Sequence, residues 1–481
     1  MGNTGSLKVG KGAFLLSAGI ILALMIVSGA LTRALPAGVF ERVTEGSRIL
    51  VVPGSYREVP RPAYPFWRWF TAPVEILYGP ESLTPVVLCV FILIVGGSIG
   101  ILERAGVMEA LIGLLVARFK KRRYLLIAVL IFFFMFLSGF VAIYEAMIPM
   151  VVFMVPIAIS LGWDSLTGLG ISLLPLGFGL AAAVTNPFTV GVAQEIAGLP
   201  LFSGFPVRLA FFIIVYGTLC FFVIRHAKKV EKDPACSSCY ADDEKLRSKI
   251  IPAETGSPSS PRKIRALVCF LCSISLAIAG VIITARLPGL ANLAFPIMGV
   301  CFLAGGISGG AVAGSGAGKL IGGFGRGALG MAPGIVLVLM AYSVKHIIVT
   351  GMIMDTLLYL AARLIGGAPP LAAAFLVYAA TLAMNFFIGS ASAKAMLMMP
   401  LLAPLADMAG ITRQTAVMAF DFGDGFSNMI YPTNAALLVG LSFTVAGYAR
   451  WMRWTWKLQA VILFLTAAFL VFAVRVRFGP F

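Results

Sequence analysis

Glu145 and Lys394 are charged side chains in apolar segments that glycine and proline interrupt, and both are candidates for binding chemistry. Glu145 lies within residues 138–160 and Lys394 within residues 389–408. A charge in hydrocarbon costs at least ~2.5–3.5 kcal/mol on insertion scales, so it requires a role. Lys394 could hold a carboxylate or replace a bound cation, and Glu145 could hold an amino group or take up a proton. A structural ion pair, or a lysine that reaches the membrane surface, is the alternative.

Polar residues also stand where two further apolar helices would break. Asn and Thr at such breaks either supply neutral ligands or only cap the helix ends. Broken helices at membrane depth expose backbone groups, and their N-termini suit carboxylates while their carbonyl ends suit cations. Two aspartates before the second break could complete a cation site, carry protons or face a water-filled vestibule. The residues concerned are Thr185, Asn186, Asp421, Asp424, Thr433 and Asn434.

The composition places these residues in a membrane protein. Of the 481 residues, 60% are hydrophobic and 12% are charged, whereas about 25% of the residues of a soluble domain are charged. Long runs, such as 86–101 and 209–224, are apolar around the whole helical circumference, and a helix needs roughly 20 residues to cross lipid. The strands of a membrane barrel would alternate instead. The sequence therefore predicts an all-α membrane protein with several spans.

The formal charge of +17 is concentrated where the apolar runs end. Residues 118–123 hold five cations and no acid, and residues 225–265 hold ten Lys or Arg. Clusters of this kind stay in the cytoplasm, and their placement argues against binding to nucleic acid. The first apolar run follows Lys8 and Lys11 and lacks a small-residue cleavage site. We therefore expect a retained signal anchor with a cytoplasmic N-terminus.

The two halves of the chain repeat each other. A separation of 248 residues relates the two Thr-Asn pairs, and it also relates Pro156 to Pro404, Gly162 to Gly410 and Gly177 to Gly425. A separation of 245 relates Ser98, Gly106 and Arg118 to Ser343, Gly351 and Arg363. With both basic clusters inside, the span at 84–104 runs inward and its counterpart at 331–349 runs outward. The sequence predicts two inverted-topology repeats, each with a re-entrant hairpin and a broken helix.

We expect three segments along the chain. Residues 1–226 form the first transmembrane repeat, with an N-terminal span and an external segment at 36–80. Residues 227–264 are polar and rich in proline, serine and charge, which predicts a disordered cytoplasmic linker. Residues 265–481 form the second repeat and end outside. The protein would be a multi-pass protein of the plasma membrane, which is the inner membrane if the source is a Gram-negative bacterium.

The seven cysteines do not indicate a metal centre. Cys236 and Cys239, like Cys269 and Cys272, have the spacing of half a zinc ribbon. The second pair, however, lies inside an apolar run, where a hydrated zinc site is implausible. We predict no metal and no cofactor.

Several motifs resemble one known group of membrane proteins. They are similar to the basic amino acid antiporters and to their relatives, the C4-dicarboxylate anaerobic carriers, within the ion transporter superfamily. The resemblance covers nearly the whole chain and is weakest in the linker. The motifs are residues 52–56, 188–191, 198–204, 390–395, 404–407, 410–415, 422–428 and 431–434.

The resemblance implies a secondary active transporter with a substrate cleft between the two hairpin tips, an elevator-like movement and a homodimer. The first hairpin departs from the family in one respect, because the family has paired acids where this chain has Glu145 followed by Ala146. The motifs add four residues to the candidate site: Ser390, Ser392, Ser427 and Asn428.

The nature of the substrate depends on the charges of the cleft. A zwitterionic amino acid suits Lys394 together with Glu145, so we predict exchange of basic amino acids of the arginine/ornithine type. A C4-dicarboxylate carrier needs two positive features, and ion-coupled carriage of such a solute is the alternative. The coupling ion, Na⁺ or H⁺, stays open.

An intramembrane enzyme is the strongest alternative of another class. The sequence holds no H-E-x-x-H metalloprotease motif. Asp421 and Asp424 lie on one short segment rather than on two facing helices, which is poor geometry for an aspartic dyad. Residues 314–319 resemble a phosphate-binding loop, but the first glycine and the final Ser/Thr of that motif are missing. We therefore expect transport without catalysis.

Overall fold

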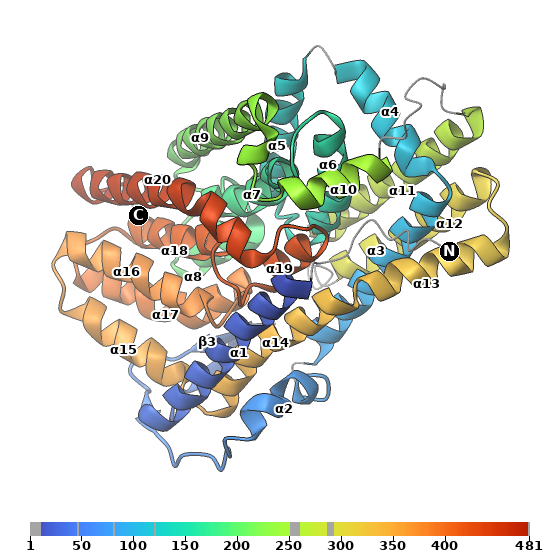
Figure 1. Cartoon of the computed structure of the whole chain (residues 1–481). Helices are drawn as coiled ribbons and strands as arrows, with labels where there is room; N and C mark the ends of the chain where they lie inside the picture. Colours follow the sequence, from blue (N-terminus) through green and yellow to red (C-terminus); the bar gives the residue numbers. More distant parts are fainter. Residues whose placement is uncertain are drawn as a thin grey trace.

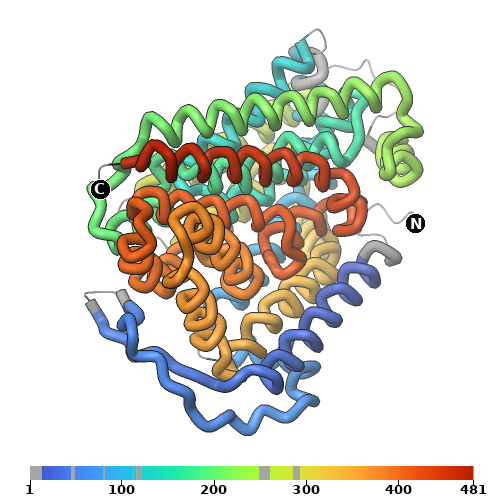
Figure 2. Tube along the Cα trace, turned by 90° about the vertical axis from the view of Figure 1, so that its left-hand side faces the viewer, coloured from blue at the N-terminus to red at the C-terminus, as the bar shows by residue number. Residues whose placement is uncertain are grey.

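The computed structural model describes residues 11–45, 48–79, 82–119, 122–250, 260–285 and 293–479 (Figures 1 and 2). Lys8, Lys120 and Lys121 of the predicted basic segments lie outside these residues. Within the described residues, β structure is confined to two small antiparallel sheets. β1 (Gly38–Val39) pairs with β4 (Arg57–Glu58), and β2 (Arg42–Glu45) pairs with β3 (Arg48–Val51).

Nine helical segments of the described chain are long and apolar enough to cross a membrane. Eight of them are α1 (Lys11–Ala34), α3 (Leu83–Arg104), α5 (Arg123–Val141), α9 (Phe205–Lys232), α11 (Pro261–Ala285), α12 (Ala294–Val312), α14 (Ala332–Thr350) and α20 (Tyr448–Arg475). The ninth is residues 165–196, in which residues 165–182 are completely buried inside the protein. It consists of α7 (Ser165–Ala182), a break, the π-helical turn Pro187–Gly191, and α8 (Val192–Ile196).

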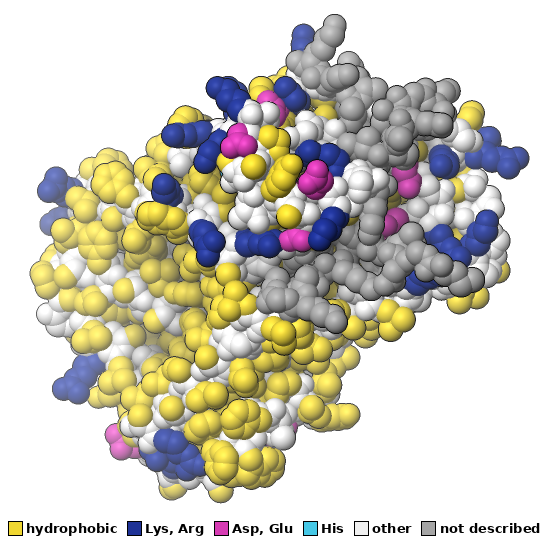
Figure 3. Space-filling view, viewed as in Figure 1, with side chains coloured by type: hydrophobic (Ala, Val, Ile, Leu, Met, Phe, Trp, Pro, Cys, Tyr) yellow, Lys and Arg dark blue, Asp and Glu magenta, His cyan; other side chains and the backbone are white. Residues whose placement is uncertain are grey.

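Shorter helices complete the chain between these spans. They are α2 (Arg68–Glu75), α4 (Val107–Phe119), α6 (Val151–Ser160), α10 (Tyr240–Ile250), α13 (Ala317–Gly330), α15 (Met354–Gly366), α16 (Pro370–Asn385), α17 (Ala391–Met408), α18 (Arg413–Ser427) and α19 (Ala435–Ser442). Hydrophobic side chains cover broad areas of the surface, while Lys and Arg gather toward one end of it (Figure 3). This distribution is the one expected for a protein surrounded by lipid.

The order of elements from α3 to α9 recurs from α14 to α20. Asp164 caps α7 and Thr412 caps α18, and Asn186 and Asn434 cap the helices that follow the two breaks. Both pairs of caps are 248 residues apart, which is the separation read from the sequence. The same local signals therefore begin the same elements in each half.

Equivalent helices of the two halves run in opposite directions. Along α9 and α20, Phe211 contacts Phe469 with ring centroids 5.2 Å apart, and Phe222 contacts Trp454 at 4.9 Å. As the residue number rises along α9, the number of the contacting residue in α20 falls, so the two helices are antiparallel. They lie side by side in Figure 2. The predicted fold class, an all-α membrane protein of two inverted repeats with a hairpin and a broken helix each, is confirmed.

Each hairpin encloses a broken helix. In the first, α5 and α6 are joined by residues 142–144 and a 3₁₀ turn, Glu145–Met150, and α7 packs against both arms. In the second, α16 and α17 are joined by residues 386–390, and α18 packs against both. The predicted segment 138–160 thus contains the turn and the returning arm of the first hairpin. The predicted segment 389–408 contains the end of the turn and the returning arm of the second hairpin.

The linker is not disordered over residues 227–250, and the prediction is wrong there. α9 continues to Lys232, a 3₁₀ turn follows at Pro234–Cys236, and α10 ends at Ile250. Side chains of this segment bond to the turn between α6 and α7, for example Trp163 Nε1 to Glu231 Oε1 at 2.7 Å. In residues 227–250, the polar side chains therefore serve to bind the polar α6–α7 turn, and their presence does not indicate a lack of structure. Residues 251–259 lie outside the described residues.

The segment 36–80 is also docked onto the helices. Asp355, at the start of α15, accepts a hydrogen bond from the Phe40 backbone N–H at 2.8 Å and pairs with Arg42 at 2.7 Å. Tyr56 stacks on Tyr359 with ring centroids 4.1 Å apart. The small sheets are thereby fixed to the second repeat.

The first prediction concerns the sides of the membrane. Glu58 and Lys245 are both exposed, in β4 and α10. In a cysteine-free background, an impermeant thiol reagent added to intact cells should label Glu58→Cys and should label Lys245→Cys only after permeabilisation. Labelling of position 245 from outside would contradict the cytoplasmic assignment of the linker.

A second prediction concerns the contact between the two broken helices. A Cβ at Gly425 in α18 would overlap with Ala181 in α7, so Gly425→Ala should destabilise the protein by about 1–3 kcal/mol. The measurement is the thermal unfolding midpoint in detergent. Gly217→Ala is the matched control, because a Cβ there meets nothing within 4 Å. Equal midpoints for the two variants would exclude tight packing at this crossing.

Candidate functional site

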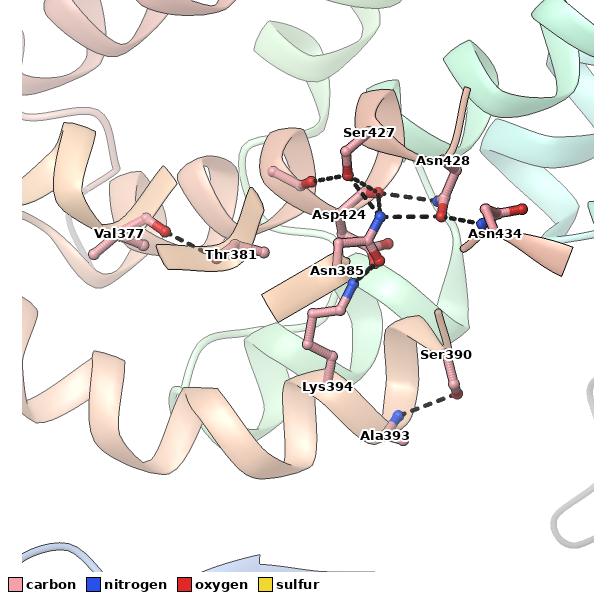
Figure 4. A network of polar contacts seen from close by, with 11 residues as sticks. Val377, Thr381, Asn385, Ser390, Ala393, Lys394, Asp424, Ser427, Asn428 and Asn434 are labelled. Atoms are coloured by element: carbon pink, nitrogen blue, oxygen red, sulfur yellow. Dashed lines mark hydrogen bonds and ion pairs between the residues drawn. The ribbon is translucent and has the colours of Figure 1, made fainter. Parts of the chain in front are cut away.

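A buried ion pair lies at the second hairpin (Figure 4). Lys394, in the first turn of α17, donates from Nζ to Asp424 Oδ1 and to Asn385 Oδ1. The side chains of Lys394 and Asp424 are 0% and 1% exposed. Lys394 thus forms an ion pair, which was one of the alternatives for this residue, and its partner is Asp424 of the broken helix.

Asn385 connects this pair to the second break. It is the last residue of α16, and its Nδ2 donates to the Asp424 carbonyl at 3.0 Å, to Ser427 Oγ at 2.6 Å and to Asn428 Oδ1 at 3.1 Å. The sequence predictions did not include it. Its signal is an amide at the end of an apolar helix, without the recurrence at a separation of 248 residues that marks the Thr-Asn pairs.

The second break is closed by side-chain amides. Asn434 Nδ2 donates to Asn428 Oδ1 at 2.6 Å, and Asn434 Oδ1 accepts from the Leu437 N–H at 2.9 Å, so Asn434 caps α19. Asn428 Nδ2 donates to the Asp424 carbonyl at 3.0 Å, and Ser427 Oγ donates to the Gly423 carbonyl at 2.6 Å. The structure brings these predicted residues into one network with Lys394.

The first break is held by backbone groups of α5 instead. Asn186 Nδ2 donates to the Ser138 carbonyl at 3.0 Å, and its Oδ1 accepts from the N–H groups of Phe188 and Thr189. Thr185 Oγ1 donates to the Phe140 carbonyl at 3.2 Å. Capping, which was the alternative role for these residues, therefore describes what they do in this conformation.

Arg208 is a further buried charge that the sequence predictions missed. It lies in the first turn of α9 and is 0% exposed. Its guanidinium donates to the Val184 carbonyl at 3.2 Å and to the Phe202 carbonyl at 3.0 Å. The arginine thus ties the first break to the loop before α9. Its position in the first turn of a long apolar span resembled that of an interfacial anchor.

Glu145 is separate from the Lys394 network. It begins the 3₁₀ turn at the first hairpin tip and is exposed. Asp424 and Tyr342 lie close enough for electrostatic interaction with it. Ser390, at the other tip, is exposed and caps α17 by accepting from the Ala393 N–H at 3.4 Å. Ser392 is half-buried in the first turn of the same helix.

Three predicted residues hold buried side-chain oxygens without a partner among the described residues. Both carboxylate oxygens of Asp421 have no hydrogen-bond partner, and neither have Asp424 Oδ2 and Thr433 Oγ1. Asp421 lies one turn before Asp424 on α18, and the opposite charge of Arg208 acts on it. An unpartnered buried carboxyl is costly when ionised. Asp421 therefore suits proton uptake better than a permanent charge.

The site as a whole offers two kinds of group. In this conformation, the charges of Lys394 and Asp424 neutralise each other. The groups left accessible are the Glu145 carboxylate at one tip and the N-terminal turn of α17 at the other, whose backbone N–H groups carry partial positive charge. Such a pair can bind a small solute that carries both an anionic and a cationic group.

Comparison with known proteins gives one family over nearly the whole chain. The family model for the C4-dicarboxylate anaerobic carriers matches residues 14–475. The chain is 29% identical over 469 residues to a protein of Escherichia coli strain K12 named "Putative basic amino acid antiporter YfcC", covering 90% of this chain and 91% of the relative.

Two further proteins are similar over most of their length. An uncharacterized protein of Haemophilus influenzae is 26% identical over 433 residues, covering 89% of this chain and 82% of that one. The YdaH transporter of Alcanivorax borkumensis has a solved structure that matches with 18% identity and a TM-score of 0.41, covering 97% of this chain and 99% of that one. From the family match, the chain belongs to the C4-dicarboxylate anaerobic carrier family of membrane transporters.

Proposed function

We propose that the chain is a secondary active transporter that exchanges basic amino acids, of the arginine and ornithine type, across the plasma membrane. The observation that supports this substrate class is the state of the two hairpin charges. Lys394 is neutralised by Asp424, whereas Glu145 is exposed at the other tip. The charge offered to a solute is therefore negative, and it suits the cationic group of such an amino acid.

The substrate carboxylate would meet the second tip. α17 begins there with the exposed cap Ser390, and the N-terminus of a helix favours an anion. An acid at one tip and an electropositive helix end at the other complement a basic amino acid. The name of the Escherichia coli relative favours the same substrate class.

A C4-dicarboxylate is the second candidate, and the family match favours it. Two carboxylates need two positive features, and the α17 N-terminus supplies one. Lys394 could supply the other only after its release from Asp424. A proton or Na⁺ bound at Asp424 would release it, so carriage of a dicarboxylate would be coupled to an ion.

Counterflow tests the substrate class. Purified protein in sealed vesicles loaded with arginine, ornithine, succinate or malate should accumulate labelled arginine only against arginine or ornithine, without nucleotide and without chemical change of the solute. Accumulation of succinate against malate, with none of arginine, would replace the proposal by the dicarboxylate alternative.

The next prediction concerns Glu145. If its carboxylate holds the cationic group, Glu145→Gln should weaken binding of arginine by roughly ten- to a hundred-fold, because a charge-assisted bond contributes about 1.5–3 kcal/mol. The measurement is the arginine concentration for half-maximal exchange. Glu58→Gln, at another exposed acid, is the control and should leave it unchanged. An unaltered value in Glu145→Gln would exclude this residue from the site.

A further prediction separates the structural from the binding role of Lys394. Lys394→Met leaves Asp424 buried and unpaired, which should destabilise the protein by about 3–5 kcal/mol. The double variant Lys394→Met/Asp424→Asn leaves no unpaired charge and should recover most of that loss in thermal unfolding.

The affinity of the double variant for arginine shows whether Lys394 also binds the substrate. If the pair is structural in the substrate-bound state too, the double variant should bind arginine as the wild type does. If stability recovers but binding stays weaker by roughly ten- to a hundred-fold, Lys394 holds the substrate carboxylate after all.

A further inference from the structure

α10, the helical part of the linker, binds to the turn between α6 and α7 through hydrogen bonds. Asp243 of α10 accepts a hydrogen bond from the Ser165 N–H at 2.9 Å on Oδ2 and one from Ser165 Oγ on Oδ1. Ser165 is the first residue of α7. A carboxylate from the linker therefore takes one of the N–H groups that a helix start leaves without a partner.

Other bonds surround this contact. Arg247 Nη2 donates to the Trp163 carbonyl at 3.0 Å. Asp164 Oδ2 accepts from Ser237 Oγ at 2.7 Å and lies 3.0 Å from His226 Nε2. The linker and the end of α9 thus hold the α6–α7 turn from two sides, and α10 covers it in Figure 1.

α7, the helix whose first residue bonds to Asp243, leads directly to the candidate site. α7 runs from Ser165 to Ala182, and the first break with Thr185 and Asn186 follows at once. α6 is the returning arm of the first hairpin. Any movement of this hairpin and α7 relative to α9 and the linker has to break the bonds of Asp243.

Asp243 is placed to respond to pH. Burial and the neighbouring Asp164 charge raise its pKa from the ordinary 3.8 to about 7, against the opposing effects of the Ser165 bonds and Arg247. The pKa of Asp164 is lowered, because its bonds to His226, Thr167 and Ser237 outweigh its burial. The titratable and charged groups that face Asp243 or border its cleft are Asp164, His226, Cys239, Tyr240, Glu244, Arg247 and, from α20, Arg450.

We propose that docking of α10 on the start of α7 is a proton-controlled latch, in which Asp243 senses the pH on the linker's side of the membrane and sets the rate of transport. Asp243 lines a small, partly open cleft together with Trp163, Tyr240 and Glu244, and proton exchange of the carboxyl would take place through this cleft.

The direction follows from linkage. Asp243 has a higher pKa when docked than when free, so proton binding favours docking. Docking is tightest at low pH, weakens by roughly tenfold per pH unit between about 4 and 7, and is weakest above about 7. Acidification on the linker's side should therefore hold α7 in place and slow transport, and neutral pH should release it.

Cys239 offers a direct readout of docking, because it is 0% exposed between the 3₁₀ turn and α10. In the full chain with its other six cysteines replaced by serine, the labelling rate of Cys239 by a thiol reagent reports undocking. The rate is compared with that of Asp243→Asn, a permanently uncharged isostere, at each pH. Burial raises the pKa of the Cys239 thiol, and the ionised Asp243 raises it further. The effect of Asp243 slows labelling of the wild type at high pH and so cannot produce the expected rise.

The ratio of wild-type to Asp243→Asn labelling should rise at least ~tenfold between pH 5 and pH 7.5. Asp242→Asn, whose residue pairs with Arg450 at 2.8 Å, is the neighbouring control and should keep the pH dependence. A ratio that does not change with pH would overturn the latch. This readout needs no substrate, so it stands or falls independently of the proposed function.

Exchange in proteoliposomes tests the effect on transport. The exchange rate of the wild type relative to Asp243→Ala should fall as the pH on the linker's side is lowered from 7.5 to 5, because only the wild type can be latched. Dividing by the variant removes the titration of the substrate site. A constant ratio, with Cys239 labelling still dependent on pH, would overturn the control of transport by this contact.

Discussion

The buried pair of Lys394 and Asp424 constrains the second repeat more than any other interaction described here. Two charges removed from water need each other and additional hydrogen bonds. Asn385 accepts one from Lys394 and donates one to the Asp424 backbone carbonyl, while Asp424 Oδ2 has no partner among the described residues. The last residue of α16, the first turn of α17 and the end of α18 must therefore stay together. The hairpin and the broken helix behave as one unit because separating them would leave each charge unpaired.

The two repeats have diverged around this constraint. In the first, the break is held by neutral contacts, with Asn186 bonded to the Ser138 carbonyl, and the charge at the tip, Glu145, stays exposed. In the second, the charge of the hairpin is buried and paired. An inverted repeat supplies equivalent backbones, while single side chains decide in which half the hairpin charge is paired and in which half it stays exposed.

Patterns along the chain predicted the helical class, the repeat and the hairpins, because hydrophobic runs, glycine positions and Thr-Asn breaks are local signals. The partner of Lys394 was not predictable, since Glu145 and Asp424 are both plausible acids and only packing places one of them beside the ammonium. Asn385 and Arg208 carried too little local signal within apolar helices. The linker was wrongly predicted to be disordered because composition does not reveal a docking surface, here the α6–α7 turn.

The same pair bears on the choice of solute. If the second hairpin opened during transport, Lys394 on α17 and Asp424 on α18 would each need a replacement partner. A basic amino acid could supply both, because its carboxylate could meet the ammonium and one of its two cationic groups the aspartate, while the other remains for Glu145. A dicarboxylate satisfies only Lys394 and leaves Asp424 to a proton or a metal cation. Exchange of one basic amino acid for another would thus leave neither Lys394 nor Asp424 uncompensated, whereas carriage of a dicarboxylate would require a coupled ion at each opening.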